Sequence, residues 1–326
     1  MNERLFGKTG RMVTEIGLGT WQLGTKWGDP FNPEEAERIL EAAYDAGITL
    51  IDTADGYNGG NSEKAIGSFI KKHPDHFFVT TKIGRRSNPH TAESYNEANL
   101  TKYVDACLER LQLEKLDLVL LHCPPTPVFS NDEVFAIMDK MKKAGKILNY
   151  GVSIEKVSEG LAAMKYDISA IEVIYNMFRM KPEKELFPAA KANNVGILAR
   201  VPLASGILTG KFRKDTVFGP KDHRTFNRNG ESFDKGETFS GVDYATGIEA
   251  AEELKKLFGT EELAPIAIRW ILMNDAVSTV IPGASRREQV LSNVKAAEVP
   301  SLTDEQMAGV RAIYDKYIKD SVECLW

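Results

Sequence analysis

The chain has 326 residues, 43% of them hydrophobic and 27% charged, an ordinary composition for a globular protein with a sizeable core. Its formal net charge of -5 argues against nucleic-acid binding, which normally needs a basic field. The first residues lack an apolar signal core, and no apolar run is long enough to span a membrane, so a cytoplasmic location is predicted. Cys107, Cys123 and Cys324 follow no metal or disulfide spacing, as expected in a reducing cytosol.

Strand-like and helix-like segments alternate along the chain, and no change of composition marks a linker. Residues 1–12 predict a hairpin that plugs one end of the fold, residues 13–21 a first strand, and residues 32–47 an amphipathic helix with Asn32 as N-cap. Seven further strand-like runs follow, with helices between them, at residues 47–57, 77–84, 116–124, 146–153, 168–175, 195–203 and 276–283. Eight such units favour a closed α/β fold, a (β/α)8 TIM barrel, over an open sheet. Because barrels commonly run this long as one domain, residues 1–326 are predicted to form a single domain.

A long polar segment follows the seventh predicted strand. Residues 211–247 are rich in glycine and contain several aromatic residues. A loop of this length in a compact domain usually has a functional role. We therefore expect a lid that covers the cofactor and the substrate.

Three ionisable residues stand at the ends of three successive apolar runs. Asp52, Lys82 and His122 each occur where a short run rich in Ile, Leu and Val passes into a loop. In a parallel barrel the carboxyl ends of the strands meet at one rim, where the chemistry is located. Tyr57 lies five residues after Asp52 and can reach the same rim. An acid, a phenol, an amine and an imidazole therefore face one cavity.

These four residue types suit the reduction of a carbonyl group. Hydride transfer to the carbonyl carbon leaves an alkoxide that Tyr57 can protonate, although its reference pKa of about 10 is high for this task. An ammonium at Lys82 lowers the pKa of the phenol, and Asp52 supplies the counter-charge. His122 can orient the carbonyl oxygen and stabilise its developing charge. In the alternative interpretation, Asp52 and Lys82 form a structural ion pair while Tyr57 and His122 only line a pocket.

Several fragments occur in an order typical of one enzyme family. They are LFGKTGRMVTEIGLGTWQLG, IDTADGYNGGNSEKAIG, LHCP, GVS, YN, PLASGILTGKF and VIPGASRREQVLSN. In these fragments the chain resembles the aldo-keto reductase family, in particular bacterial NADPH-dependent members, over essentially its whole length. The resemblance implies a barrel that uses NADPH/NADP+ to reduce carbonyl substrates, generally without a metal. It also assigns Asp52, Tyr57, Lys82 and His122 as the catalytic tetrad.

The last third of the chain predicts a site for the phosphates of the cofactor. Residues 280–289 contain a strand, a glycine turn and a helix start, where barrels bind phosphate. Arg286, Gln289 and Asn293 are spaced to share one helical face, whereas Glu288 is expected to lie off that face. The resemblance places Arg286 near the adenosine 2′-phosphate and Gln289 and Asn293 near adenine. Further cofactor-binding candidates are Gly19, Thr20, Trp21, Leu203, Ser205, Gly206, Leu208, Lys211, Gly283 and Ser285.

Positions expected at the nicotinamide depart in part from the commoner family pattern. Ser153 matches the pattern, but Ile154 stands where an Asn often follows. Glu172 stands where a Gln usually recognises the carboxamide, and it can accept a hydrogen bond from the amide but cannot donate one. Arg200 occupies a position that is often aromatic. Because Glu172 and Arg200 lie on neighbouring strands, they are predicted to form a buried pair.

The substrate site is predicted from aromatic residues near the rim. Trp21, Tyr57, His122 and Phe129 are the substrate-binding candidates, and Trp27, Phe226 and Phe239 lie on later parts of rim loops. Such walls would suit hydrophobic or aromatic carbonyls. The remaining histidines share no metal-ligand spacing, so no metal site is predicted.

The sequence thus predicts an NADPH-dependent reductase of aldehydes or ketones with Tyr57 as general acid. Its partner is a small-molecule carbonyl substrate. Two alternatives stay open. The chain could run the reverse reaction as an alcohol or sugar dehydrogenase, or it could be a cofactor-sensing regulatory subunit like the related channel β subunits.

Overall fold

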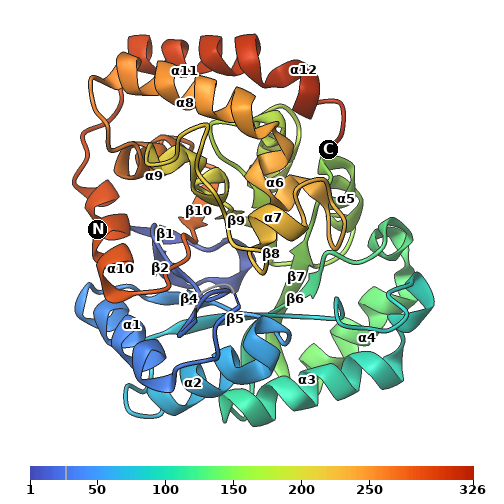
Figure 1. The fold of residues 1–326 in the computed structure, drawn as a ribbon. Helices are drawn as coiled ribbons and strands as arrows, with labels where there is room; N and C mark the ends of the chain where they lie inside the picture. The colour runs from blue at the N-terminus through green and yellow to red at the C-terminus, as the bar shows by residue number, and fades with distance from the viewer. Residues whose placement is uncertain (26–27) are drawn as a thin grey trace.

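The computed structural model describes residues 1–25 and 28–326. Eight parallel strands, each paired with the next one along the chain, form the centre of the molecule (Figure 1). Two isolated parallel bridges, Ile16–Val280 and Gly19–Gly283, join the first strand region to the last and close the barrel. The predicted (β/α)8 barrel is confirmed. Its strands are β3 (Leu18–Gly19), β4 (Leu50–Asp52), β5 (Phe78–Ile83), β6 (Leu116–His122), β7 (Ile147–Ser153), β8 (Ala170–Ile174), β9 (Gly196–Arg200) and β10 (Val277–Val280).

Helices surround the strands (Figure 1). The helix predicted at 32–47 is confirmed, and the side chain of Asn32 accepts a hydrogen bond from Glu35 N as its N-cap. Among the helices that the structure describes, none is both long and apolar enough to cross a membrane. The outer helices are α1 (Pro33–Asp45), α2 (Asn61–Ile70), α3 (Glu97–Leu111), α4 (Asp132–Lys143), α5 (Val157–Ala163), α6 (Leu186–Ala192), α8 (Tyr244–Phe258), α9 (Ala264–Leu272), α10 (Arg287–Val294), α11 (Asp304–Tyr317) and α12 (Lys319–Val322).

The N-terminal hairpin takes residues that were predicted to belong to the first barrel strand. Its strands are β1 (Glu3–Leu5) and β2 (Met12–Thr14), and only Leu18–Gly19 of the predicted strand 13–21 pairs within the barrel. The prediction of one continuous strand was wrong, because the backbone N–H of Glu15 still bonds to Asn2 O. The backbone of residues 12–15 therefore forms the second strand of the hairpin and the bond that follows it, and not a barrel strand.

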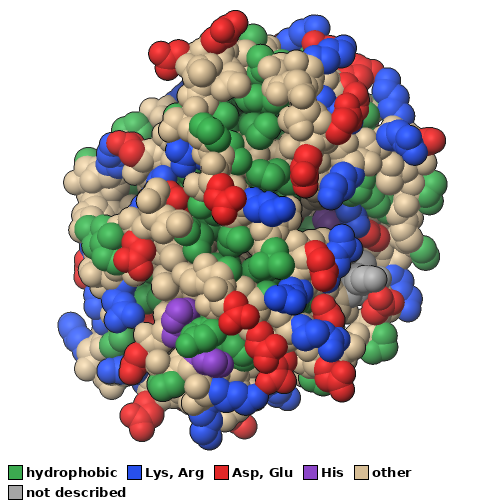
Figure 2. Space-filling model, turned by 90° about the vertical axis from the view of Figure 1, so that its left-hand side faces the viewer, with side chains coloured by type: hydrophobic (Ala, Val, Ile, Leu, Met, Phe, Trp, Pro, Cys, Tyr) green, Lys and Arg blue, Asp and Glu red, His purple; other side chains and the backbone are tan. Residues whose placement is uncertain are grey.

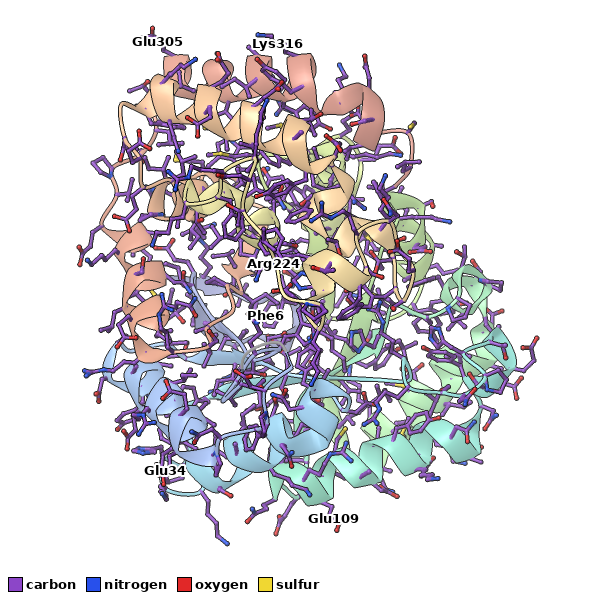
Figure 3. The ribbon with its side chains drawn as sticks, in the orientation of Figure 1. Phe6, Glu34, Glu109, Arg224, Glu305 and Lys316 are labelled. Atoms are coloured by element: carbon purple, nitrogen blue, oxygen red, sulfur yellow. The ribbon has the colours of Figure 1, made fainter. Side chains whose placement is uncertain are left out.

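The hairpin closes the amino-terminal end of the barrel. Phe6 is fully buried and packs with the residues that fill the barrel interior, among them Phe78 and Leu198. A Cβ on Gly196, at the start of β9, would lie 2.4 Å from the Phe6 ring, so this position admits only glycine. Figure 3 shows Phe6 near the projected centre of the barrel. With this end filled, the cavity described below lies at the opposite, carboxyl end of the strands.

The lid crosses the carboxyl end. It follows the short helix η6 (Ala204–Thr209) and contains the short helices α7 (His223–Phe226), η7 (Lys235–Glu237) and η8 (Phe239–Gly241). The predicted lid range ran too far, because Asp243 caps α8 and residues 244–247 form its first turn. Asn227 stabilises the lid: its side chain donates to Thr238 Oγ1 at 3.1 Å and accepts from the backbone N–H groups of Ser232 and Phe233 at 2.8 Å. The lid is thus a folded element.

One face of the surface can be followed in Figure 2. It is the side that carries α1 and α10, and acidic and basic side chains are interspersed over it. A nucleic-acid-binding face would instead gather basic side chains. The expected lack of nucleic-acid binding stays a prediction.

Candidate active site

A cavity of about 1020 Å³ lies at the carboxyl ends of the strands and beneath the lid. Asp52, Tyr57 and His122 line it, together with Trp21. The cavity therefore connects the predicted catalytic residues with most of the predicted cofactor positions. Those that line it are Gly19, Thr20, Trp21, Glu172, Arg200, Leu203, Ser205, Gly206, Lys211, Gly283, Arg286, Gln289 and Asn293.

The four predicted catalytic side chains lie together because neighbouring strands deliver them. Asp52 ends β4, Lys82 is in β5, and His122 ends β6, while Tyr57 begins the short helix η2 (Tyr57–Gly60). The ammonium of Lys82 donates to Asp52 Oδ1 at 2.7 Å and to Tyr57 Oη at 3.3 Å. The rings of Tyr57 and His122 meet edge to face, with centroids 6.1 Å apart. The geometry joins phenol, ammonium and carboxylate in one hydrogen-bonded chain.

The acid–base state of Tyr57 differs from the sequence-based expectation. Burial raises the pKa of Tyr57 above its ordinary value, and the ammonium of Lys82 acts in the opposite direction without outweighing burial. The predicted effect of Lys82 is present, since its ammonium lowers the pKa of the phenol, but burial and the charges of Asp52 and Glu172 act against it and the net shift is upward. Tyr57 is therefore a neutral phenol near neutral pH, the form that donates a proton.

His122 is also uncharged. Burial, reinforced by the positive charges of Arg85 and Lys82, holds the pKa of His122 well below its usual range. Its Nδ1 atom has no hydrogen-bond partner among the residues described. A neutral imidazole that lines the cavity can donate one hydrogen bond to a substrate oxygen.

The predicted contact between Glu172 and Arg200 exists, but it is the weaker contact for both residues. Arg200 Nε lies 3.9 Å from Glu172 Oε1, and no hydrogen bond joins them. Glu172 is nearer to Lys82, at 3.4 Å, and Arg200 is nearer to Glu155, at 3.0 Å. Sequence analysis missed Glu155. Since Glu155 comes just after β7, the rule that picked out Asp52 could have found it.

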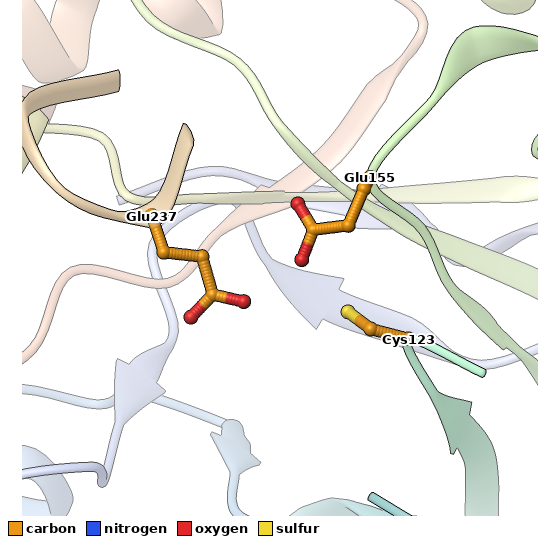
Figure 4. Close-up of side chains that lie close together, drawn as sticks. All are labelled: Cys123, Glu155 and Glu237. Atoms are coloured by element: carbon orange, nitrogen blue, oxygen red, sulfur yellow. The ribbon is translucent and has the colours of Figure 1, made fainter. Parts of the chain in front are cut away.

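Glu155 belongs to a cluster that joins the lid to the barrel. Its carboxyl group and that of Glu237 face one another, with the sulfur of Cys123 beside them (Figure 4). Although these three side chains could hold a metal ion by distance alone, Arg85 lies 2.6 Å and Arg200 3.6 Å from Glu237. The two guanidinium groups already neutralise the carboxylates. We therefore describe the cluster as an ion-pair network between the barrel and the lid.

At the phosphate end of the cavity, the prediction that Glu288 lies away from Arg286 was wrong. Arg286 is the extended N-cap residue of α10, so it does not share the helical face of Gln289 and Asn293. As a result, Glu288 does not lie away from Arg286: it lines the cavity, and its carboxylate is 3.7 Å from Arg286 Nε. An acidic side chain thus stands beside the cation that was predicted to bind the 2′-phosphate.

Some predicted site residues do not line the cavity. Ser153, Leu208 and Phe129 are buried, and Leu208 and Phe129 pack in the hydrophobic core. The hydroxyl of Ser285 donates a hydrogen bond to Gln289 Oε1 at 3.1 Å, so its proton is already used in a contact within the protein. These residues were predicted from the family resemblance or from their place near the rim, and neither determines the direction of a side chain. Trp27 lies outside the described residues.

The substrate end of the cavity is more polar than expected. Phe239 is buried and Phe226 does not line the cavity, so the prediction of a mainly aromatic wall was wrong. Trp21 does line it and packs against Phe233 and His223, which come from the lid. The polar side chains around it, which sequence analysis did not select, are Gln22, Asp55, Arg85, Arg86, His223 and Glu237.

The cavity fits a dinucleotide at both ends. At the catalytic end, Glu172 lines the cavity, and its buried Oε2 atom accepts no hydrogen bond from the described residues although it lies 3.4 Å from Lys82 Nζ, so this carboxylate can accept from an amide donor. In the loop after β9, Gly206 has a φ of +103°, and a Cβ there would lie 2.7 Å from the ring of Phe212. This loop therefore depends on a glycine and presents backbone to the cavity.

A closed parallel barrel with this buried polar cluster beside such a cavity defines a nicotinamide-dependent oxidoreductase. The sequence model of the Aldo/keto reductase family matches residues 15–315. Aldo-keto reductase YhdN of Bacillus subtilis (strain 168) is 31% identical over 323 residues, which covers 96% of this chain and 94% of that protein. The chain therefore belongs to the aldo/keto reductase family, and the resemblance inferred from its motifs is confirmed.

Two further comparisons show the range of the relatives. The putative voltage-gated potassium channel subunit beta of Schizosaccharomyces pombe (strain 972 / ATCC 24843) is 30% identical over 316 residues, covering 93% of this chain and 90% of that protein. The solved structure of the glycerol dehydrogenase AKR11B4 from Gluconobacter oxydans aligns with a TM-score of 0.78 and 29% identity, covering 97% of this chain and 96% of that one. The likeness thus extends over nearly the whole chain.

Proposed function

We propose that the protein reduces small polar aldehydes or ketones with NADPH, with Asp52, Tyr57, Lys82 and His122 as its catalytic residues. The observation that carries the proposal is the hydrogen-bonded chain from Asp52 through Lys82 to Tyr57, which ends in a neutral phenol on the cavity wall. Membership of the aldo/keto reductase family supports the reaction class.

The roles of the residues follow from their charges. When bound, the reduced nicotinamide supplies a hydride to the carbonyl carbon. As the C=O double bond opens, its electron pair moves to oxygen, and the O–H of Tyr57 donates the proton that completes the alcohol. Lys82 stabilises the phenolate left on Tyr57 until solvent returns the proton. The neutral His122 donates a hydrogen bond to the same oxygen and holds it toward Tyr57.

The preference for NADPH is expected to be moderate. Arg286 supplies a cation at the phosphate end, which supports NADPH. Glu288, 3.7 Å from Arg286, opposes a second negative charge at the same place. Both side chains are more than half exposed, so solvent screens each effect. We expect NADPH to bind about tenfold more tightly than NADH.

The walls of the substrate end support a polar, hydroxylated carbonyl. Asp55, Arg85 and Glu237, which line the same cavity as Trp21, combine hydrogen-bond acceptors and donors. Such a set can hydrogen-bond several hydroxyl groups, whereas a plain aromatic carbonyl would displace water from these polar side chains without offering them hydrogen bonds. The glycerol dehydrogenase AKR11B4 is a relative whose name contains a hydroxylated substrate. Because this relative is named a dehydrogenase, oxidation of an alcohol remains the second candidate function.

A substrate panel tests the proposal. NADPH consumption should be faster with small hydroxylated aldehydes than with aromatic aldehydes of similar size, and it should be undetectable without a carbonyl compound. A protein that binds NADPH but turns over none of the panel in either direction would instead support the regulatory alternative. The cytoplasmic location stays a prediction.

A further inference from the structure

Two carboxylates share one ammonium at the catalytic centre. Lys82 Nζ lies 2.7 Å from Asp52 Oδ1 and 3.4 Å from Glu172 Oε2, and all three side chains are at most 4% exposed. The same ammonium donates to Tyr57 Oη at 3.3 Å. Because water is excluded, each of these charges acts strongly on its neighbours. The ammonium of Lys82 therefore interacts with the carboxylates of Asp52 and Glu172 and with the phenol of Tyr57.

The second carboxylate weakens the effect of Lys82 on the phenol. An isolated ammonium beside Tyr57 would favour the phenolate, and Asp52 alone would offset part of that effect. Glu172 adds a further negative charge within reach of the same ammonium. Its Oε2 atom accepts no hydrogen bond from the residues described, so the ammonium of Lys82, at 3.4 Å, is the cation nearest to it.

We propose that Glu172 sets the acid–base balance of Tyr57. By sharing the ammonium of Lys82, it keeps the phenol protonated well above neutral pH. This favours carbonyl reduction, in which Tyr57 donates a proton, over alcohol oxidation near neutrality, in which Tyr57 must accept one. The consequence for reaction direction rests on the proposed function, whereas the effect on the phenol does not.

The directions of the pKa shifts agree with this geometry. After burial, the charges of Asp52 and Glu172 raise the pKa of Tyr57, while Lys82 lowers it. Burial and then Glu172 raise the pKa of Asp52. Glu172→Gln therefore removes the second carboxylate from the ammonium of Lys82 and leaves Asp52 as its partner.

The other charged groups near the cluster do not take over this role. Arg200, on β9, comes within 3.9 Å of Glu172 but is nearer to Glu155. Arg85, after β5, pairs with Glu237 of the lid. On β6 and just after it, burial keeps His122 and Cys123 in their neutral forms. Among the described residues, Asp52 and Glu172 are thus the carboxylates in ion-pair distance of Lys82.

The test measures the phenol directly and without cofactor or substrate. The ultraviolet absorbance of tyrosinate is followed against pH in the wild type and in Glu172→Gln, and each curve is corrected with the same protein carrying Tyr57→Phe. We expect Glu172→Gln to lower the pKa of Tyr57 by about one to three pH units, as charges at such distances do. Glu172→Asp, which keeps the charge, should stay closer to the wild type.

A second carboxylate provides the matched control. Asp55 also lines the cavity, but no contact joins its carboxylate to Lys82. Asp55→Asn should leave the pKa of Tyr57 within about half a unit of the wild type. An unchanged titration in folded Glu172→Gln, or an equal shift in Asp55→Asn, would overturn the proposal. If Glu172→Gln does not fold, the Glu172→Asp titration decides alone, since a shorter charged side chain must shift the curve part of the way.

The kinetic consequence is measured separately. In Glu172→Gln, alcohol oxidation near pH 8 should become about tenfold faster for each pH unit by which the pKa of Tyr57 falls, relative to the wild type. The alkaline limb of the reduction profile should move to lower pH by the same amount. A shifted titration without any turnover in either protein would contradict the proposed function and leave the role of Glu172 toward Tyr57 intact.

Discussion

The two ends of the cavity are built in different ways. At the catalytic end, Lys82, Asp52 and Glu172 are almost completely buried within the barrel. At the phosphate end, the side chains of Arg286 and Glu288, at the start of α10, are 55% and 73% exposed. Charge interactions are strong where water is excluded and weak where water and salt screen them. The barrel therefore fixes the chemistry, while the exposed start of α10 leaves the cofactor preference easy to change.

The largest effect should come from the buried end. Tyr57→Phe keeps the ring and removes only the proton donor, so carbonyl reduction should fall about 10²- to 10⁴-fold. NADPH affinity, measured by fluorescence titration, should stay close to that of the wild type, because no cofactor contact is removed. Wild-type turnover in the purified variant would show that another group donates the proton.

The same substitution at both ends sharpens the comparison. Arg200→Met should lower the free energy of unfolding by about 3–5 kcal/mol, because the buried Glu155 loses its guanidinium partner and Glu172 and Glu237 each lose one of two nearby cations. Arg286→Met, at a residue more than half exposed, should change it by no more than about 0.5 kcal/mol. Both values come from urea unfolding. Equal losses for the two variants would contradict the contrast between the two ends.

A double-mutant cycle shows which carboxylates depend on Arg200. Glu172→Gln, added to Arg200→Met, should recover part of the lost stability, because it removes one uncompensated charge. The recovery should be incomplete, since Glu237 stays within the cluster. Strict additivity would mean that Glu172 and Arg200 act independently at their separation of 3.9 Å.

The cluster between lid and barrel should give stability a pH dependence. Burial, together with the charge of Glu237, raises the pKa of Glu155 from its ordinary value to about 8, although Arg200 opposes the shift. A carboxyl group whose pKa is higher in the folded state stabilises the fold fully below its unfolded pKa and loses this effect as the pH rises through the folded value. The wild type should therefore lose stability between about pH 5 and about pH 9.

Glu155→Gln is the matched variant for this pH dependence. It removes the titration and keeps the shape of the side chain, so its thermal midpoint should fall less over the same pH range. The measurement is thermal unfolding at a series of pH values. A parallel decline in the two proteins would place the pH dependence elsewhere, for example at Asp55, whose pKa burial raises to about 6.

The smallest effects should occur at the phosphate end. Arg286→Ala should remove most of the preference for NADPH by weakening NADPH binding alone, a change of about tenfold that added salt also reduces. Glu288→Gln should strengthen NADPH binding a few-fold and leave NADH unchanged. Both are measured by fluorescence titration. Equal affinity of the wild type for the two cofactors would refute the assignment of Arg286 and leave the catalytic residues untouched.

The sequence by itself determined the barrel and the rim at which the four predicted catalytic residues lie. Short apolar runs with one ionisable residue at the end indicate buried parallel strands, and parallel strands bring their ends to one rim. Asp52, Lys82 and His122 were found in this way, and Tyr57 followed from its distance along the chain. The inferences for Asp52, Lys82 and His122 depend on where each strand ends, and the sequence shows this point as the change from an apolar run to a loop.

Only the tertiary structure decided the electrostatics and the walls of the cavity. The distance between Glu155 and Glu237 depends on how the lid folds back, and Arg286 meets Glu288 because Arg286 precedes the helix instead of belonging to it. Phe129 was misplaced because a short helix can turn a loop side chain inward. Residue spacing along the chain predicts the type of each secondary-structure element and the end of a strand at which a residue lies. The pKa of Tyr57, by contrast, depends on burial and on charges from three different strands, which meet only in the folded barrel.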